Sequence, residues 1–137
     1  MAEVIFANLL KKRERKGVVV KGAGVGALIG EVMSDDAREA LKRCGERVGD
    51  KPRPNTLFRP QMLQQFDYII CMETEHKQHI VSGGVYNTRA KVCTLDELTG
   101  CGEVPDPWCK PLDAYIKVCK QLQSACVLLY NVLLEGV

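Results

Sequence analysis

Phe66-Asp-Tyr-Ile-Ile-Cys-Met72 (FDYIICM) is a continuous, largely apolar run in the middle of a chain of 137 residues. Strands that are buried on both faces have this pattern, because helices cover both sides of a parallel sheet. A second β-branched run, Ala90–Leu95 (AKVCTL), follows the polar stretch Glu73–Val81 (ETEHKQHIV). The order predicts a strand, a helix and a second strand, paired in parallel through a crossover.

The N-terminal part of the sequence predicts a helix followed by a short strand. Residues 2–16 carry one apolar stripe and end at Gly17, a residue typical of helix ends. Val18–Val20 (VVV) is β-branched and is expected to be a strand. It leads into a glycine-rich loop at residues 21–30. The stripe consists of Ala2, Ile5, Phe6, Leu9 and Leu10.

Further helices are predicted on both sides of the central strand. Ser34 is a candidate N-cap for a helix at Asp35–Cys44, and Gly45 follows that helix. A short helical piece is expected at Pro60–Gln65, and one long helix from Leu112 onward. A length of 137 residues suits one domain over residues 1–137.

Alternating helices and strands predict an α/β fold, a single-domain three-layer open sheet that is mostly parallel. Ligands of such sheets bind beyond the carboxyl ends of the strands. The glycine-rich loop, the segment after FDYIICM and the segment Glu103–Trp108 (EVPDPW) each follow a predicted strand. We therefore expect these three segments to meet at one edge of the sheet.

Composition and charge argue against nucleic-acid and membrane partners. The formal net charge is +2, but five of the basic residues lie within residues 11–16, at the end of the predicted first helix. Cations at that position offset the helix dipole, and no aromatic residue is interleaved that could stack on bases. Hydrophobic residues make up 46% of the chain, with no run as long as a membrane span and no signal-peptide pattern.

Seven cysteines without a signal peptide indicate reduced thiols and a cytoplasmic location rather than a disulfide scaffold. No C-x-x-C pair is present, so a zinc ribbon or a thioredoxin-type site is not expected. Cys119 and Cys126 lie seven residues apart on the predicted long helix, which suits two small core residues.

Asp106 lies between two prolines in EVPDPW, next to Trp108, the only tryptophan. Each proline fixes its own φ and restricts the residue before it to extended backbone, so Asp106 is held on a stiff segment. One interpretation is an ordinary turn, since Asp and Pro are common turn residues. The other is a carboxyl group presented at a pocket mouth, as a general acid requires.

Two other patterns predict weaker sites. Gly22, Gly24 and Ala27 match G-x-G-x-x-A after a predicted strand, but the strongest helix N-cap comes only at Ser34, which disfavours a dinucleotide site. A second pattern combines two histidines with two glutamates on a polar stretch, with no further metal ligand evident. A solvated helix face is therefore preferred over a metal site at His76, His79, Glu73 and Glu75.

Five segments, in their order and near their spacing, resemble the low-molecular-weight protein tyrosine phosphatases. They are MAEVIF (1–6), GAGV (22–25), DDAREALKRCG (35–45), QQFDYIICM (64–72) and EVPDPW (103–108). The resemblance spans nearly the whole chain. In that family a cysteine thiolate attacks the phosphorus of phosphotyrosine, and an aspartate in a D-P-Y or D-P-W segment protonates the leaving phenolate. The resemblance assigns the acid role to Asp106 and a pocket-wall role to Trp108. It implies a phosphotyrosine protein, or a small phosphate or sulfate anion, as the ligand, with no cofactor or metal.

The nucleophile of that family is not found in these residues. The family motif C-x5-R-S-P belongs just ahead of the MAE helix, and no C-x5-R occurs at any of the seven cysteines. A reactive thiolate needs a helix N-terminus or cations, and a phosphate needs N–H groups and an arginine. We therefore expect no phosphatase turnover from this chain. Arsenate reductases of the same fold depend on the same absent cysteine.

Smaller departures from the family are Glu73, where an aspartate is usual, and Cys109, where a second tyrosine is common. The resemblance also implies that a first strand is missing between Val18–Val20 and FDYIICM. Flanking strands could close that gap, another segment or a second copy could fill it, or the protein has further residues ahead of Met1. The last is our expectation. The alternative is a non-catalytic pseudophosphatase or interaction module that self-associates through the open sheet.

Overall fold

The two predicted central strands pair in parallel. In the computed structural model, β1 (Tyr68–Cys71) lies beside β2 (Lys91–Thr94), with Tyr68 opposite Lys91. The helix α4 (Thr74–Val81) connects them as a crossover. The structure describes residues 1–25, 32–50, 54, 56–83 and 88–136.

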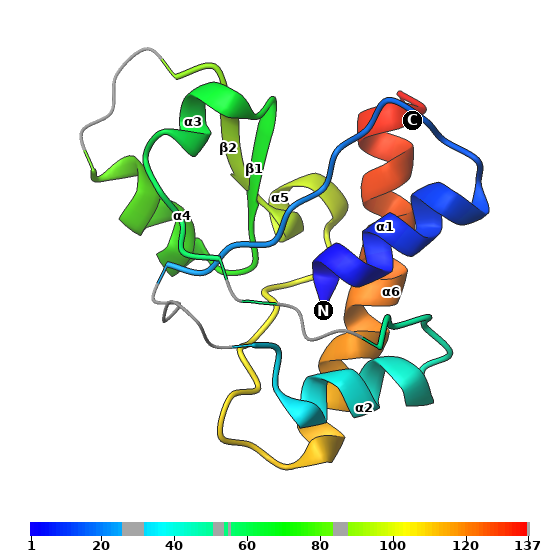
Figure 1. Ribbon diagram of the computed structural model, residues 1–137. Helices are drawn as coiled ribbons and strands as arrows, with labels where there is room; N and C mark the ends of the chain where they lie inside the picture. The colour runs from blue at the N-terminus through cyan, green and yellow to red at the C-terminus, as the bar shows by residue number, and fades with distance from the viewer. Residues whose placement is uncertain (26–31, 51–53, 55, 84–87, 137) are drawn as a thin grey trace.

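Side chains of β1 and of Met72, which follows it, alternate between two hydrophobic clusters, as the pleat of a strand requires. Ile69 and Cys71 pack with α4 and the short helix α3 (Met62–Gln65), whereas Ile70 and Met72 pack toward the larger cluster on the other face. Figure 1 shows the two strands with α3 and α4 on one side and the remaining helices on the other. The three-layer, parallel arrangement predicted from FDYIICM is confirmed for the described residues.

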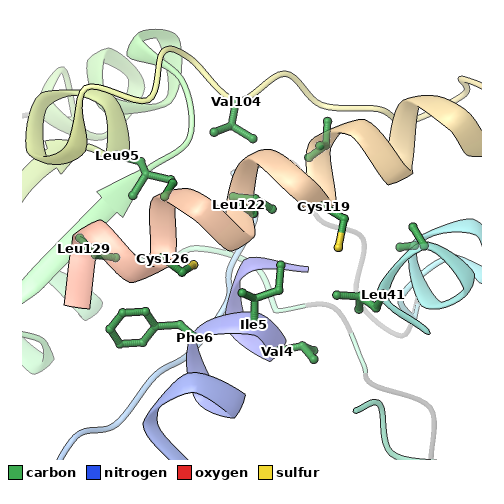
Figure 2. Packing of buried hydrophobic residues seen from close by; sticks show 14 of the residues in the cluster. Val4, Ile5, Phe6, Leu41, Leu95, Val104, Cys119, Leu122, Cys126 and Leu129 are labelled. Atoms are coloured by element: carbon green, nitrogen blue, oxygen red, sulfur yellow. The ribbon is translucent and has the colours of Figure 1, made fainter. Parts of the chain in front are cut away.

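The larger cluster is built around the long C-terminal helix α6 (Leu112–Leu134). Against it pack α1 (Ala2–Lys12), α2 (Asp35–Arg43) and α5 (Leu95–Thr99), and Figure 2 shows their side chains meeting. One stripe of α6 is buried, with the spacing of a helix that faces a core. Its members are Tyr115, Val118, Cys119, Leu122, Ala125, Cys126, Leu129 and Tyr130. The two cysteines are therefore core residues, as predicted.

Local signals explain both boundaries of α2 and the C-terminal end of α1. The Ser34 hydroxyl accepts a hydrogen bond from the Ala37 N–H at 3.2 Å, which confirms the predicted N-cap of α2. Gly45, just past the end of α2, has φ +82°, as expected for a left-handed C-terminal turn. The predicted first helix ends earlier than Gly17. Glu14 takes the left-handed conformation with φ 53°, and the Arg15 N–H bonds back to the Leu10 carbonyl.

The predicted strand Val18–Val20 is wrong. These residues form no ladder within the described chain, although Val18 and Val20 pack on the larger cluster and Val19 is 74% exposed. β-Branched side chains favour extended backbone because they pack well on a half-buried surface, and this preference does not require a hydrogen-bonded partner strand. The only pairing of this region in the described residues is the isolated parallel bridge of Gly24 with Leu57.

The basic segment at residues 11–16 is exposed, as expected for a helix end. Arg13 stacks on Tyr130 of α6, with 4.4 Å between the guanidinium carbon and the ring centroid. The stacking adds a cation–π contact between α1 and α6. In the described part of the chain, no helix combines the length and apolar character needed to cross a membrane.

Candidate active site

The EVPDPW loop is bonded to the carboxyl end of β1. The Val104 N–H donates to the Met72 carbonyl at 3.0 Å, and the Thr74 N–H donates to Glu103 Oε1 at 2.8 Å. Val104 is itself buried in the larger cluster. The prediction that this loop and the segment after FDYIICM meet at one edge of the sheet is therefore confirmed.

Two further side chains hold the start of this loop. Asp96 Oδ1 accepts a hydrogen bond from the Gly102 N–H at 2.8 Å. From α6, the Gln121 amide donates to the carbonyl oxygens of Cys101 and Glu103, at 3.3 and 3.1 Å. The loop is thus tied to β1, α5 and α6 on the N-terminal side of Asp106.

Sequence reasoning missed α5 and hence the role of Asp96. The signal was present, because Thr94-x-x-Glu97 is a capping-box pattern. Thr94 Oγ1 accepts a hydrogen bond from the Glu97 N–H at 3.0 Å and begins the helix directly after β2. The Gln121 contacts had no comparable local signal, since they join residues that are 18 to 20 positions apart.

Asp106 is exposed on this anchored loop, between exposed Pro105 and buried Pro107. Its Oδ1 accepts a hydrogen bond from the Trp108 N–H at 3.1 Å, which orients the carboxyl group over its own turn. The Lys110 N–H donates to the Pro107 carbonyl at 2.9 Å and closes the next turn. The two interpretations of EVPDPW therefore coexist: the segment is a turn, and the turn presents the carboxyl group.

Asp106 lies on a shallow groove of about 240 Å³ between the loop and α6. The groove floor is largely apolar, and the cations lining it are Lys110 and Lys117. Trp108 is 73% exposed and is not among the lining residues, so its pocket-wall role stays a prediction. The complete lining is Pro105, Asp106, Pro107, Lys110, Ala114, Lys117, Val118 and Gln121.

Glu103 is the residue of the EVPDPW loop whose pKa is shifted. The hydrogen bonds that it accepts from Thr74 favour its ionised form and lower its pKa from 4.5. Because the folded-state pKa is lowered, the contribution of Glu103 to stability is present above its unfolded pKa. This contribution is lost as the pH falls through the folded pKa.

The substitution Glu103→Gln should therefore destabilise the protein at neutral pH and have less effect in acid. Glutamine keeps an acceptor for the Thr74 N–H but removes the charge that strengthens the bond. Urea unfolding of both proteins at pH 7 and at about pH 3 measures the difference in free energy of unfolding. Glu75→Gln, on neighbouring α4, controls for the loss of a negative charge. A difference that does not change with pH would contradict the assignment.

The buried cysteines Cys71, Cys93 and Cys126 are not set up as nucleophiles. Burial raises the pKa of Cys71 to about 11 and that of Cys126 to about 12, and it also raises the pKa of Cys93. A buried protonated thiol is a poor first attacker on a substrate, because the thiolate is the attacking species.

Gly22 and Gly24 lie in backbone that bonds other segments of the protein. The Gly22 N–H donates to Glu3 Oε2 at 2.6 Å, and Gly24 exchanges backbone hydrogen bonds with Thr56 and Phe58. The dinucleotide pattern requires a helix that begins at Gly24, and Gly24 and Val25 are not helical. Ala27 and the rest of the glycine-rich loop at residues 26–30 lie outside the described residues.

The histidines lie on α4, as predicted, with His79 exposed and His76 half-buried. The described residues contain no cluster of three or more His, Cys, Asp or Glu side chains that could hold a metal ion.

The model of the low molecular weight phosphotyrosine protein phosphatase family matches residues 1–136. The chain belongs to this family. The resemblance read from FDYIICM and EVPDPW is thereby confirmed at the family level.

Individual relatives agree with that membership. The low molecular weight protein-tyrosine-phosphatase YfkJ of Bacillus subtilis is 30% identical over 92% of this chain and 81% of its own length. A Geobacillus stearothermophilus protein-arginine-phosphatase is 26% identical over 86% of this chain and 78% of its own. The crystal structure of the low molecular weight protein tyrosine phosphatase from T. tengcongensis matches with a TM-score of 0.84 and 31% identity. That match covers 96% of this chain and 88% of the phosphatase.

Proposed function

We propose that this protein is a phosphatase-family domain in which Asp106 is the proton donor to the leaving oxygen of a phosphate monoester. The observation that carries the proposal is the anchored loop. Val104 is bonded to β1, Pro107 is buried, and the carboxyl group between them is exposed on a groove. Membership of the phosphotyrosine phosphatase family supports the assignment.

The chemistry requires an acid whose position does not change during the reaction. A phenolate leaves more easily when it is protonated as the P–O bond breaks, and positioned proton transfer contributes about 10²–10⁴ in rate. The two prolines and the Trp108 N–H limit the rotation of Asp106. We assign exposed Trp108 to the wall that contacts the aromatic ring of a phosphotyrosine protein substrate.

The acid alone does not make a phosphatase. These 137 residues contain no C-x5-R sequence, and burial raises the pKa of four of their cysteines. We therefore propose that these residues by themselves give no turnover, and that they act without a metal or an organic cofactor. The family membership also supports a cytoplasmic location.

The second candidate is a non-catalytic interaction module that retains the fold and recognises a phosphotyrosine protein or a small phosphate or sulfate anion. The same absence of C-x5-R favours it. Self-association through the edge of β1 belongs to this candidate, and size-exclusion chromatography of the purified chain distinguishes a monomer from a dimer.

Hydrolysis of para-nitrophenyl phosphate tests the proposed lack of turnover directly. The purified chain and its Asp106→Ala variant should both hydrolyse the substrate no faster than buffer, with circular dichroism confirming that both are folded. Activity of the unmodified chain that falls in Asp106→Ala would show a nucleophile outside the C-x5-R motif. That result would overturn the proposed inactivity while supporting Asp106 as the acid.

A further inference from the structure

Two cysteines of the larger cluster lie where the end of α2 packs against α6. Cys44 is half-buried at the C-cap of α2, and Cys119 is fully buried on α6. Both side chains pack in the larger cluster, and burial together with the nearby Cys44 thiol raises the pKa of Cys119 to about 12. In Figure 2, Cys119 lies on the side of α6 near Leu41 of α2.

The backbone that carries Cys44 is held in place against α6. The Gln123 amide donates to the Cys44 carbonyl at 2.9 Å and to Glu46 Oε2 at 2.7 Å. From α1, the Asn8 amide donates to Glu46 Oε1 at 3.2 Å. Gln123 lies one helical turn after Cys119 on α6, so these bonds hold Cys44 against the part of α6 that carries Cys119.

We propose that Cys44 and Cys119 form an oxidative modification site, which hydrogen peroxide converts to a disulfide between the end of α2 and α6. In the first step the Cys44 sulfur attacks one peroxide oxygen, the O–O bond breaks, and a sulfenic acid and water form. In the second step the Cys119 sulfur attacks the sulfenic sulfur and releases a second water. Two thiols are oxidised, and one peroxide is reduced to two waters.

Exposure decides the order of the two steps. Cys44 is the thiol that solvent reaches, so it meets the peroxide first. Cys119 is buried and protonated, which makes it a poor first attacker. It needs no access to solvent for the second step, because its partner already lies beside it.

The other described cysteines are less suited to a disulfide, although Cys93 raises the pKa of Cys71 and Cys101 raises that of buried Cys126. Cys71 and Cys93 lie on adjacent strands, but Cys93 is in register with Ile70 and not with Cys71, so the two side chains point to opposite faces of the sheet. The Cys101 thiol donates to the neighbouring Gly102 carbonyl at 3.1 Å. Cys109 is exposed and directly follows Trp108 at the end of the EVPDPW loop.

Peptide mapping tests the site, because trypsin releases both cysteines on short peptides. Cleavage after Arg43, Arg47, Lys117 and Lys120 gives Cys44–Arg47 and Val118–Lys120. The folded chain is treated with hydrogen peroxide, its remaining thiols are alkylated, and the digest is analysed by mass spectrometry. We expect the two peptides linked, lighter by two hydrogens than their sum, and separated again by dithiothreitol.

Two variants make the result decisive without disturbing the fully buried position. Cys44→Ser should abolish the linked peptide and leave Cys119 as a free thiol. Cys109→Ser, which removes the exposed cysteine, should leave the linkage unchanged. Recovery of Cys44 as a sulfinic acid, or joined to any cysteine other than Cys119 of the same chain, would overturn the proposal.

Discussion

Replacement of Asp106 by asparagine is expected to lower kcat for phosphotyrosine by about 10²–10⁴ once a nucleophile is supplied. The nucleophile would come from a fusion that places the C-x5-R segment of a relative, such as B. subtilis YfkJ, ahead of residue 1. Asparagine keeps the oxygen that accepts the Trp108 N–H, so the turn is preserved and only the transferable proton is lost. Steady-state kinetics of the fusion and its variant give the ratio.

The leaving group separates proton donation from a structural effect. Tyrosine has a pKa near 10, and para-nitrophenolate is a much better leaving group that needs less protonation. The loss of rate should therefore be larger for phosphotyrosine than for para-nitrophenyl phosphate. Asp113→Asn, an exposed residue in the first turn of α6, removes the same charge and should retain activity. Equal losses on the two substrates would rule out Asp106 as the acid.

Leu41→Ala is expected to lower the free energy of unfolding by about 2–5 kcal/mol. Leu41 is completely buried between α2 and α6, and the alanine leaves a cavity that the two packed helices do not close. Single domains are stable by only about 5–15 kcal/mol, so the variant loses a large part of its stability. Urea unfolding followed by circular dichroism measures the difference.

Leu128→Ala is the matched control for the core substitution. Leu128 lies on α6 and is 45% exposed, so the same truncation should change the stability by no more than about 0.5 kcal/mol. Similar losses from the two substitutions would mean that α2 does not depend on Leu41 for its packing against α6.

Much of this fold was predictable because its signals are local. FDYIICM predicted β1, since a continuous apolar run is typical of a strand covered on both faces. Ser34 and Gly45 predicted the two ends of α2 through an N-cap hydrogen bond and a left-handed turn. The Thr94 capping box was equally local and would have predicted α5. The order of these elements was enough to predict a parallel sheet with helices on both faces.

The failures have a different origin. Val18–Val20 has the composition of a strand, but a strand also needs a neighbour to pair with, and no described residue pairs with it. α1 ends at the left-handed Glu14, where the Arg15 N–H bonds back to the Leu10 carbonyl, and the left-handed Gly17 comes only three residues later. In both cases the outcome depends on partners that the local sequence does not specify.

The candidate site divides in the same way. The sequence by itself determined that Asp106 is held stiffly between prolines on a loop after a strand, because proline restricts the backbone wherever it occurs. Only the tertiary structure decided what holds that loop: Met72 just after β1, Thr74 at the start of α4, and Gln121 from α6. It also brought Cys44 against α6, one helical turn from Cys119. These contacts join residues far apart in the chain, and they exist only because burial of apolar side chains packs the helices and strands together.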